Sequence, residues 1–250
     1  MSMTAQEVVR TSTYQVGVGS TNILDTYLSQ EHFSGTGITY LYTTDRARTD
    51  RSWHTLMEHQ ANLSKVSDRP EQVDELQGDY TFFIGRLRRW SLLSDRLTLE
   101  AGGMAAVNLG FIYNTYNSNS PAQARFSLNL MPTGAATYRF RLFGRNTALR
   151  YEVQLPLVGV MFSPNFGQSY YEIFNRGNYD NNIVATTFVS SPTMRHQLMA
   201  DINISSKTTL RFGYLGDILQ SDVNSLKSHI YSHRFMLGFV KKFSVKRLRP

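Results

Sequence analysis

The sequence contains no cysteine among its 250 residues. This absence excludes disulfide bonds, catalysis by a thiolate and any metal site built on cysteine. The sequence also lacks a continuously apolar stretch of about 20 residues, the length that a membrane-spanning helix requires. The chain could therefore cross a bilayer only as a closed β-barrel, the other structure that satisfies every backbone hydrogen bond in lipid.

An export signal is also missing from the first ten residues, MSMTAQEVVR, which have no apolar core. An outer-membrane protein needs such a signal. A membrane barrel therefore implies that this numbering describes a mature form with an added start. Residues 1–12 are polar, and we expect them to form a flexible leader before a barrel of residues 13–250.

The net charge is +7, and its distribution matters more than its size. Basic clusters at Arg46–Arg51, Arg86–Arg89 and Lys241–Arg249 lie near expected turns or the C-terminus. Such placement favours contact with acidic lipid headgroups over nucleic acid, and the sequence carries no fingerprint of a nucleic-acid-binding module. We expect outer-membrane lipid and lipopolysaccharide as partners, and no nucleic acid.

The clearest positive signal runs from Ala124 to Phe162, where two long arms flank the short polar segment FGRNT. Polar and apolar residues alternate along both arms, which is typical of strands with one polar and one apolar face. Both arms are longer than an ordinary soluble strand, which has about five or six residues. A long amphipathic hairpin is the repeating unit of a transmembrane β-barrel.

The same alternation recurs along the chain and predicts an all-β fold, a single antiparallel up-and-down transmembrane β-barrel of about ten strands, with twelve as the alternative. A bulge is expected at Gly85–Arg89, where the alternation loses phase. The connections alternate in length. Short turns are expected near 47–52, 91–96, 143–147 and 205–208, and longer loops near 24–36, 66–78, 113–123, 163–193 and 220–229.

Alternation alone does not say which face is inside, so a soluble lipocalin-like barrel or a sandwich stays open. Strand length, loop asymmetry and aromatic residues near strand ends favour the membrane. The charged face then lines the lumen, where buried charges must be paired. We expect a paired filling, with a selective channel as the alternative. The expected lumen charges are Glu58, Glu100, Arg125, Arg139, Arg141, Arg150, Glu152, Asp201, Arg211, Asp217 and Arg234.

Catalytic chemistry finds little support in the sequence. A proteolytic barrel needs Asp and His side chains together at the outer rim, and Asp217 with His229 is the one candidate pair. The plain alternative is that His229 is an ordinary loop histidine. We expect no catalytic residues, no cofactor and no metal site.

The segment of residues 22–42, NILDTYLSQEHFSGTGITYLY, resembles a family of small outer-membrane barrels from Bacteroidetes. In that family an LxDTYLS stretch follows the first strand and precedes a Y/F-x-G-x-G stretch. The matching positions here are Leu24–Ser29, Phe33, Gly35 and Gly37. The resemblance implies a location in the bacterial outer membrane and no established activity.

From these observations we expect a non-enzymatic outer-membrane barrel that is a structural or accessory subunit of an envelope complex. The loop Ser163–Thr193 would contact other outer-membrane proteins or lipoproteins. Two alternatives remain, a small-solute or ion pore through the charged lumen and a lipid-modifying or proteolytic barrel enzyme.

Overall fold

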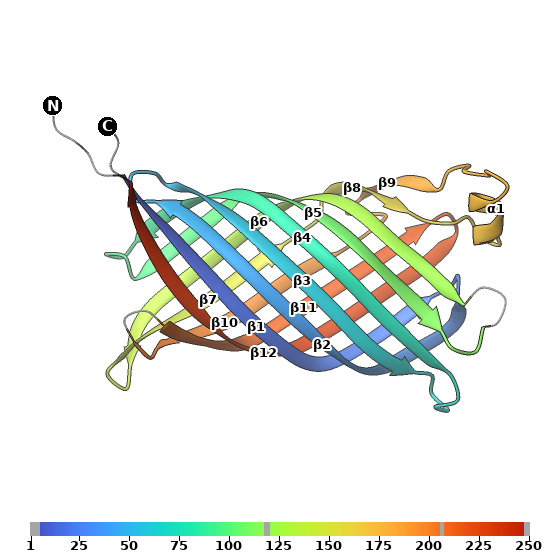
Figure 1. Cartoon of the computed structure of the whole chain (residues 1–250), viewed down its shortest axis with the longest axis horizontal. Helices are drawn as coiled ribbons and strands as arrows, with labels where there is room; N and C mark the ends of the chain where they lie inside the picture. Colours follow the sequence, from blue (N-terminus) through green and yellow to red (C-terminus); the bar gives the residue numbers. More distant parts are fainter. Residues whose placement is uncertain (1–5, 118–120, 206–207, 248–250) are drawn as a thin grey trace.

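Twelve strands form one antiparallel sheet in the computed structural model (Figure 1), which describes residues 6–117, 121–205 and 208–247. Ten of these strands close into a ring, because β1 pairs with β12 and β5 pairs with β6. This confirms the predicted antiparallel barrel. Its strands are β1 (Gln6–Asp25), β2 (Ser29–Arg48), β3 (Trp53–Ser67), β4 (Asp74–Leu92), β5 (Leu97–Asn114), β6 (Ala122–Leu142), β7 (Arg145–Gln154), β10 (Met194–Asn203), β11 (Thr208–Val223) and β12 (Leu226–Arg247).

Two short strands, β8 (Val158–Phe162) and β9 (Ile183–Thr187), extend the wall beside β6. Pro156 follows β7 and cannot donate to a ladder, so the strand breaks there before β8 resumes pairing with β6. Within the described residues β9 pairs with β8 alone. The backbone of Ser190 accepts a hydrogen bond from the N–H of Asp222 on β11, so a linker covers that part of the wall.

The connection between β8 and β9 carries a short helix that the sequence did not predict, α1 (Tyr170–Phe174). Ser169 caps it, and its backbone N–H donates to the Glu172 carboxylate at 2.8 Å. The hydrogen bonds from Ser169 hold the pKa of Glu172 below its usual range. No helix in the described residues is long and apolar enough to cross a membrane.

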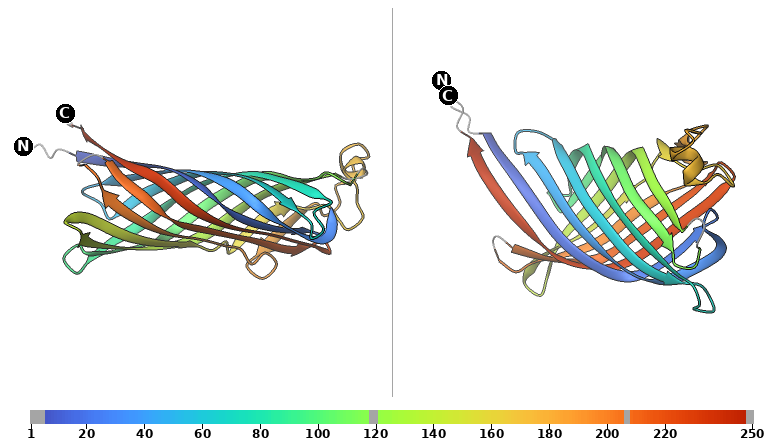
Figure 2. Two further views of the ribbon diagram at one scale, coloured as in Figure 1. Left: turned by 90° about the horizontal axis from the view of Figure 1, so that it is seen from below. Right: turned by 45° about the vertical axis from the view of Figure 1, so that its right-hand side comes forward.

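The two ends of the barrel differ (Figures 1 and 2). The turn end carries the start of β1, the end of β12 and the connections β2–β3, β4–β5, β6–β7 and β10–β11; the loop end carries α1 and the connections β1–β2, β3–β4, β5–β6, β8–β9 and β11–β12. The β7–β8 and β9–β10 connections lie along the wall, where their backbone bonds to β6 and β11. Two predicted long loops are wrong. The β1–β2 connection spans only Thr26–Leu28, and Asn224 and Ser225, both with positive φ, form the β11–β12 turn. The strand ends beside these two turns are polar in sequence and were therefore predicted as loops. Their polar side chains include groups that face the lumen, such as Asp25.

Two further predictions need correction. Residues 6–12, expected in a flexible leader, belong to β1 and pair with residues 241–247 of β12, which gives their backbone groups partners; residues 1–5 lie outside the described ranges. The bulge expected at Gly85–Arg89 is absent, because β4 keeps continuous register with β3 and β5 there. Arg86 and Arg88 sit on the outward, apolar parity, which had obscured the alternation.

The distribution of side chains is that of a membrane barrel. Outward residues such as Val16, Val18 and Ile38 are 58–59% exposed, whereas their neighbours Gln15, Thr21 and Thr39 on the lumen side are buried. An apolar outer face around a polar interior is the pattern expected in lipid. The chain is therefore a barrel of the outer-membrane type.

Apolar side chains also enter the lumen and pack in three clusters. One closes the loop end and includes Phe33, Ile112 and Ile230. The other two line opposite walls further down, around Phe83 and Met104 and around Leu41 and Met236. The polar groups of the lumen are packed between these clusters, so the interior is a mixed core.

Candidate functional site

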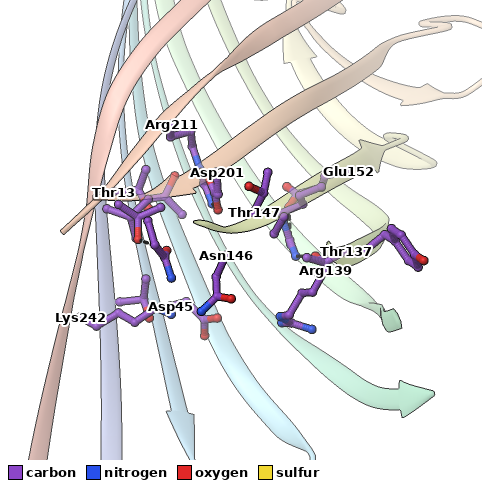
Figure 3. A pocket seen from close by; sticks show the side chains of 18 of the residues that line it. Thr13, Asp45, Thr137, Arg139, Asn146, Thr147, Glu152, Asp201, Arg211 and Lys242 are labelled. Atoms are coloured by element: carbon purple, nitrogen blue, oxygen red, sulfur yellow. Dashed lines mark hydrogen bonds and ion pairs between the residues drawn. The ribbon is translucent and has the colours of Figure 1, made fainter. Parts of the chain in front are cut away.

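A cavity of about 830 Å³ opens at the turn end of the barrel, and we call it the vestibule (Figure 3). Threonine side chains on several strands, including Thr13, Thr137 and Thr147, form much of its polar wall. Its charged side chains are Asp45, Glu58, Arg89, Arg96, Glu100, Arg139, Arg141, Arg150, Glu152, Asp201, Arg211 and Lys242. All the predicted lumen charges except Arg125, Asp217 and Arg234 therefore meet in one cavity.

The floor of the vestibule is closed by Arg195, which lies on β10 and is 2% exposed. Its Nη1 donates to Glu58 Oε2 at 2.9 Å and its Nε donates to Gln60 Oε1 at 2.9 Å. The guanidinium carbon also lies 4.8 Å from the centre of the Phe83 ring. Glu58 and Gln60 reach across the lumen from β3, so this contact joins opposite walls. The sequence list of lumen charges omitted Arg195, although it lies on the polar face of its strand.

Glu100 is the centre of the ionic network on the vestibule wall. Arg150 Nη1 lies 2.5 Å from Glu100 Oε2, and Arg89 Nη2 lies 2.6 Å from Glu100 Oε1. Arg150 also binds Glu152 at 2.7 Å. Glu100, Arg150 and Glu152 therefore form one connected group of ion pairs.

Asp45, His54 and Glu100 place three possible metal-ligand atoms within 4.8 Å of one another. His54 Nδ1 lies 2.8 Å from Asp45 Oδ1. The guanidinium of Arg89 lies within 3.0 Å of both Asp45 and Glu100, however. Arg89 therefore supplies the cation that these carboxylates need, and the group reads as an ion-paired cluster.

Arg211 and Asp201 form a two-point pair nearer the mouth, with contacts of 2.6 and 2.7 Å. Arg139 behaves differently, since its Nη1 donates to the hydroxyl of Thr98 at 2.6 Å and to the backbone oxygen of Asp95. In the part of the chain that the structure describes, no carboxylate lies within ion-pair distance of Arg139 or Arg141. The same holds for Arg96 and Lys242, so these four cations form an unpaired rim around the mouth.

The remaining predicted lumen residues lie beyond the floor. Asp217 accepts a hydrogen bond from Gln60 at 2.7 Å, and Arg125 lies 3.5 Å from Asp25. Arg234, only 1% exposed, binds hydroxyl and carbonyl groups in place of a carboxylate, including Thr21 Oγ1 at 2.6 Å. The predicted paired filling is therefore partly replaced by neutral hydrogen bonds. A second cavity of about 70 Å³ lies on this side, beside Arg125.

The structure separates the candidate pair Asp217 and His229. Asp217 faces the lumen, while His229 belongs to β12 and faces outward, where its Nε2 lies 2.8 Å from Asn22 Oδ1. The strand register explains the separation. Asp217 pairs with Ser232 on the lumen side, and His229 lies three residues from Ser232 along β12, so its side chain points to the opposite face of the wall. The pair therefore cannot act as one rim site.

Comparisons with solved structures find distant likenesses only. Three solved structures are similar over most of their length. Neisserial surface protein A has 10% identity and a TM-score of 0.36 over 95% of this chain and 97% of its own. The Ail attachment protein of Yersinia pestis has 11% identity and a TM-score of 0.32 over 94% and 99%. An outer-membrane channel of Pseudomonas putida F1 has 12% identity and a TM-score of 0.33 over 97% of each.

These likenesses are too distant to argue function from, and a search of curated proteins finds no match. A family profile gives the firmer result, since it spans almost the whole sequence. Its description names no activity, and nothing in it supports a restriction to Bacteroidetes. The chain belongs to the family described as protein of unknown function (DUF3316), whose profile matches residues 2–250.

Proposed function

We propose that this protein is a non-enzymatic, non-conducting barrel of the bacterial outer membrane that serves as an accessory subunit of an envelope assembly. The observation that carries the proposal is a closed lumen above an open vestibule. Arg195, Glu58 and Gln60 join opposite walls, and the Phe33 cluster fills the loop end. A barrel blocked at two levels is suited to holding a partner at its open end.

The vestibule gives that partner a place to dock. In outer-membrane barrels short turns face the periplasm, so the turn end would open to that compartment. The rim cations Arg96, Arg139, Arg141 and Lys242 attract negative charge. Threonine hydroxyls and Asn146 supply hydrogen-bond partners deeper in. The partner would be a periplasmic protein or lipoprotein with an extended acidic segment.

Conductance tests the closed lumen directly. The purified protein in planar bilayers is expected to give no discrete current steps, because the packed core leaves no continuous water path. A matched measurement on a known porin under the same salt shows that the bilayer can report an open barrel. Reproducible current steps from the folded wild-type protein would contradict the non-conducting part of the proposal.

Site-directed crosslinking tests the docking. The chain has no cysteine, so Asn146→Cys places a single benzophenone-maleimide probe in the vestibule. It is expected to capture one periplasmic partner in the native membrane, while the probe on Val16→Cys, on the lipid face, does not. Adding Arg96→Gln, Arg139→Gln and Arg141→Gln should cut the yield by about tenfold or more. Equal capture with and without these changes would count against the rim as a docking site.

A gated ion path is the second candidate, and one observation favours it. The layer around Arg195 is polar on both sides, since Gln154 binds Glu58 and Gln60 binds Asp217. If the path opens, Arg195→Ala should raise conductance from zero to measurable steps. If the folded variant still gives no conductance, the result supports the accessory role.

An enzymatic role is not favoured, because the structure separates Asp217 from His229. Ser34 on β2 follows His32 by two residues, but its hydroxyl accepts a hydrogen bond from the Asn22 amide at 2.8 Å. An amide N–H cannot take the proton that a serine nucleophile must lose. The proposal therefore also expects no release of fatty acid from phospholipid vesicles, with or without Ser34→Ala.

A further inference from the structure

A row of aromatic rings crosses the outer face of five adjacent strands toward the turn end. The row runs Phe239, Tyr14, Tyr42, His59 and Phe82, and each is the direct cross-strand partner of the next. Ring centroids along it are 5.2, 4.9, 5.8 and 5.0 Å apart. Rings that combine an apolar body with polar groups are typical of the boundary between hydrocarbon and headgroups.

A second row lies four residues nearer the turn end on the same strands. Its cations are Arg10, Arg46 and Arg86, placed in register on β1, β2 and β4. Four residues span roughly 13 Å along a strand, or roughly 10 Å along the membrane normal at a tilt of about 40°. The cations therefore lie at headgroup depth when the aromatic row marks the edge of the hydrocarbon.

Arg88 and Lys241 extend this set of outward cations, and aromatic contacts hold most of it. Arg10 donates to the hydroxyl of Tyr42 at 3.0 Å. The charged groups of Arg86, Arg88 and Lys241 lie 5.3–5.9 Å from the ring centres of Trp53, Trp90 and Phe239. Among the residues that the structure describes, no carboxylate pairs with any of these five cations. Their charge is thus available to an external anion.

The patch is one-sided. It covers β12 and β1 to β4, while the outward faces of β5, β6, β7, β10 and β11 toward the turn end carry apolar and aromatic side chains such as Leu99, Tyr138 and Leu198. The described exception is Arg145, at the tip of the β6–β7 hairpin. A general affinity for headgroups would place cations all around the barrel. The concentration on one side indicates a defined binding surface.

From this geometry we propose that the surface formed by Arg10, Arg46, Arg86, Arg88 and Lys241 binds anionic phospholipid headgroups of the periplasmic leaflet. The apolar outer wall beyond the aromatic row accommodates the acyl chains, and the cations meet the phosphates. A lipid fits better than an acidic protein because the patch borders the hydrocarbon-facing wall. The proposal stands apart from the vestibule, whose cations point to the lumen side of the mouth.

The test compares two triple variants that lose the same charge. Arg10→Gln, Arg46→Gln and Arg86→Gln remove three of the five cations of the outer patch, whereas Arg96→Gln, Arg139→Gln and Arg141→Gln remove three of the four cations of the vestibule rim. Phosphatidylglycerol is titrated into each purified barrel and binding is followed by native mass spectrometry, with phosphatidylcholine as the neutral lipid. A heat-modifiable gel shift establishes that each variant is folded.

The wild-type protein is expected to bind phosphatidylglycerol in preference to phosphatidylcholine. The outer triple should weaken phosphatidylglycerol binding by about tenfold or more, and the rim triple by less than about twofold. Equal weakening by both triple variants would mean that only the net charge of the protein matters, and would overturn the proposal. Unchanged phosphatidylglycerol binding by the outer triple variant would also overturn it. If the outer triple variant does not fold, the wild-type protein still provides a test. Wild-type binding that shows no preference for phosphatidylglycerol over phosphatidylcholine, or no dependence on salt, would overturn the proposal.

Discussion

Replacing Arg195 with alanine is expected to lower the free energy of unfolding by about 3–5 kcal/mol. The substitution leaves Glu58, 1% exposed, as a buried carboxylate without its cation and Gln60 without its donor. It also removes the guanidinium packed on Phe83. Urea unfolding of the barrel in lipid vesicles, followed by the fluorescence of Trp53 and Trp90, measures the change.

Arg211→Ala is the matched control, since it also removes one arginine from an ion pair in the lumen. Arg211 and Asp201 are 14% and 19% exposed, so water can solvate the carboxylate that remains. The expected loss is about 1 kcal/mol or less. Arg195→Met combined with Glu58→Leu should recover most of the Arg195→Ala loss, because an apolar pair leaves no buried charge. A loss at Arg195 no larger than at Arg211 would contradict the structural role of the floor.

Strand alternation, together with strand length and loop asymmetry, was sufficient to predict the class of fold and the face on which the site lies. Glu58 and Glu100 fall on the lumen side because side chains two residues apart share a face. Alternation does not contain the shear between strands, which decides which inward side chains meet. The contact of Arg195 with Glu58, 137 residues apart in the chain, therefore could not be predicted from the sequence.

Errors in the predicted boundaries share a physical cause. In a membrane barrel, polar residues occur inside a strand wherever they face the lumen or lie at headgroup depth. Asp25 at the end of β1 and Arg86 in β4 are examples, and both resemble loop or bulge residues in sequence. The glycine-containing stretch before Ile38 looks like a turn, but it is strand. A Cβ on Gly37 would lie 2.5 Å from Arg234 Nη2, so the glycine makes room for that buried side chain.

Gly19→Ala is the second change with a large expected effect. Gly19 pairs with Arg234 on β12 and with Gly37 on β2. A Cβ at this position would overlap the backbone oxygen of His233. Backbone held in a ladder cannot rotate away as a side chain can, so β1 and β12 must separate at the seam that closes the barrel. We expect a loss of about 3 kcal/mol or more in the free energy of unfolding.

Gly103→Ala is the matched control for Gly19, because a Cβ there would meet no atom within 4 Å. Alanine at such a position restricts the unfolded chain without straining the barrel, and a gain of about 0.4–1 kcal/mol is expected. The two substitutions add the same methyl group and should change stability in opposite directions. Refolding yield, read from the heat-modifiable gel shift, adds a second measurement, in which Gly19→Ala should fall and Gly103→Ala should not. Equal behaviour of the two variants would show that β12 does not approach Gly19 as closely as the register requires.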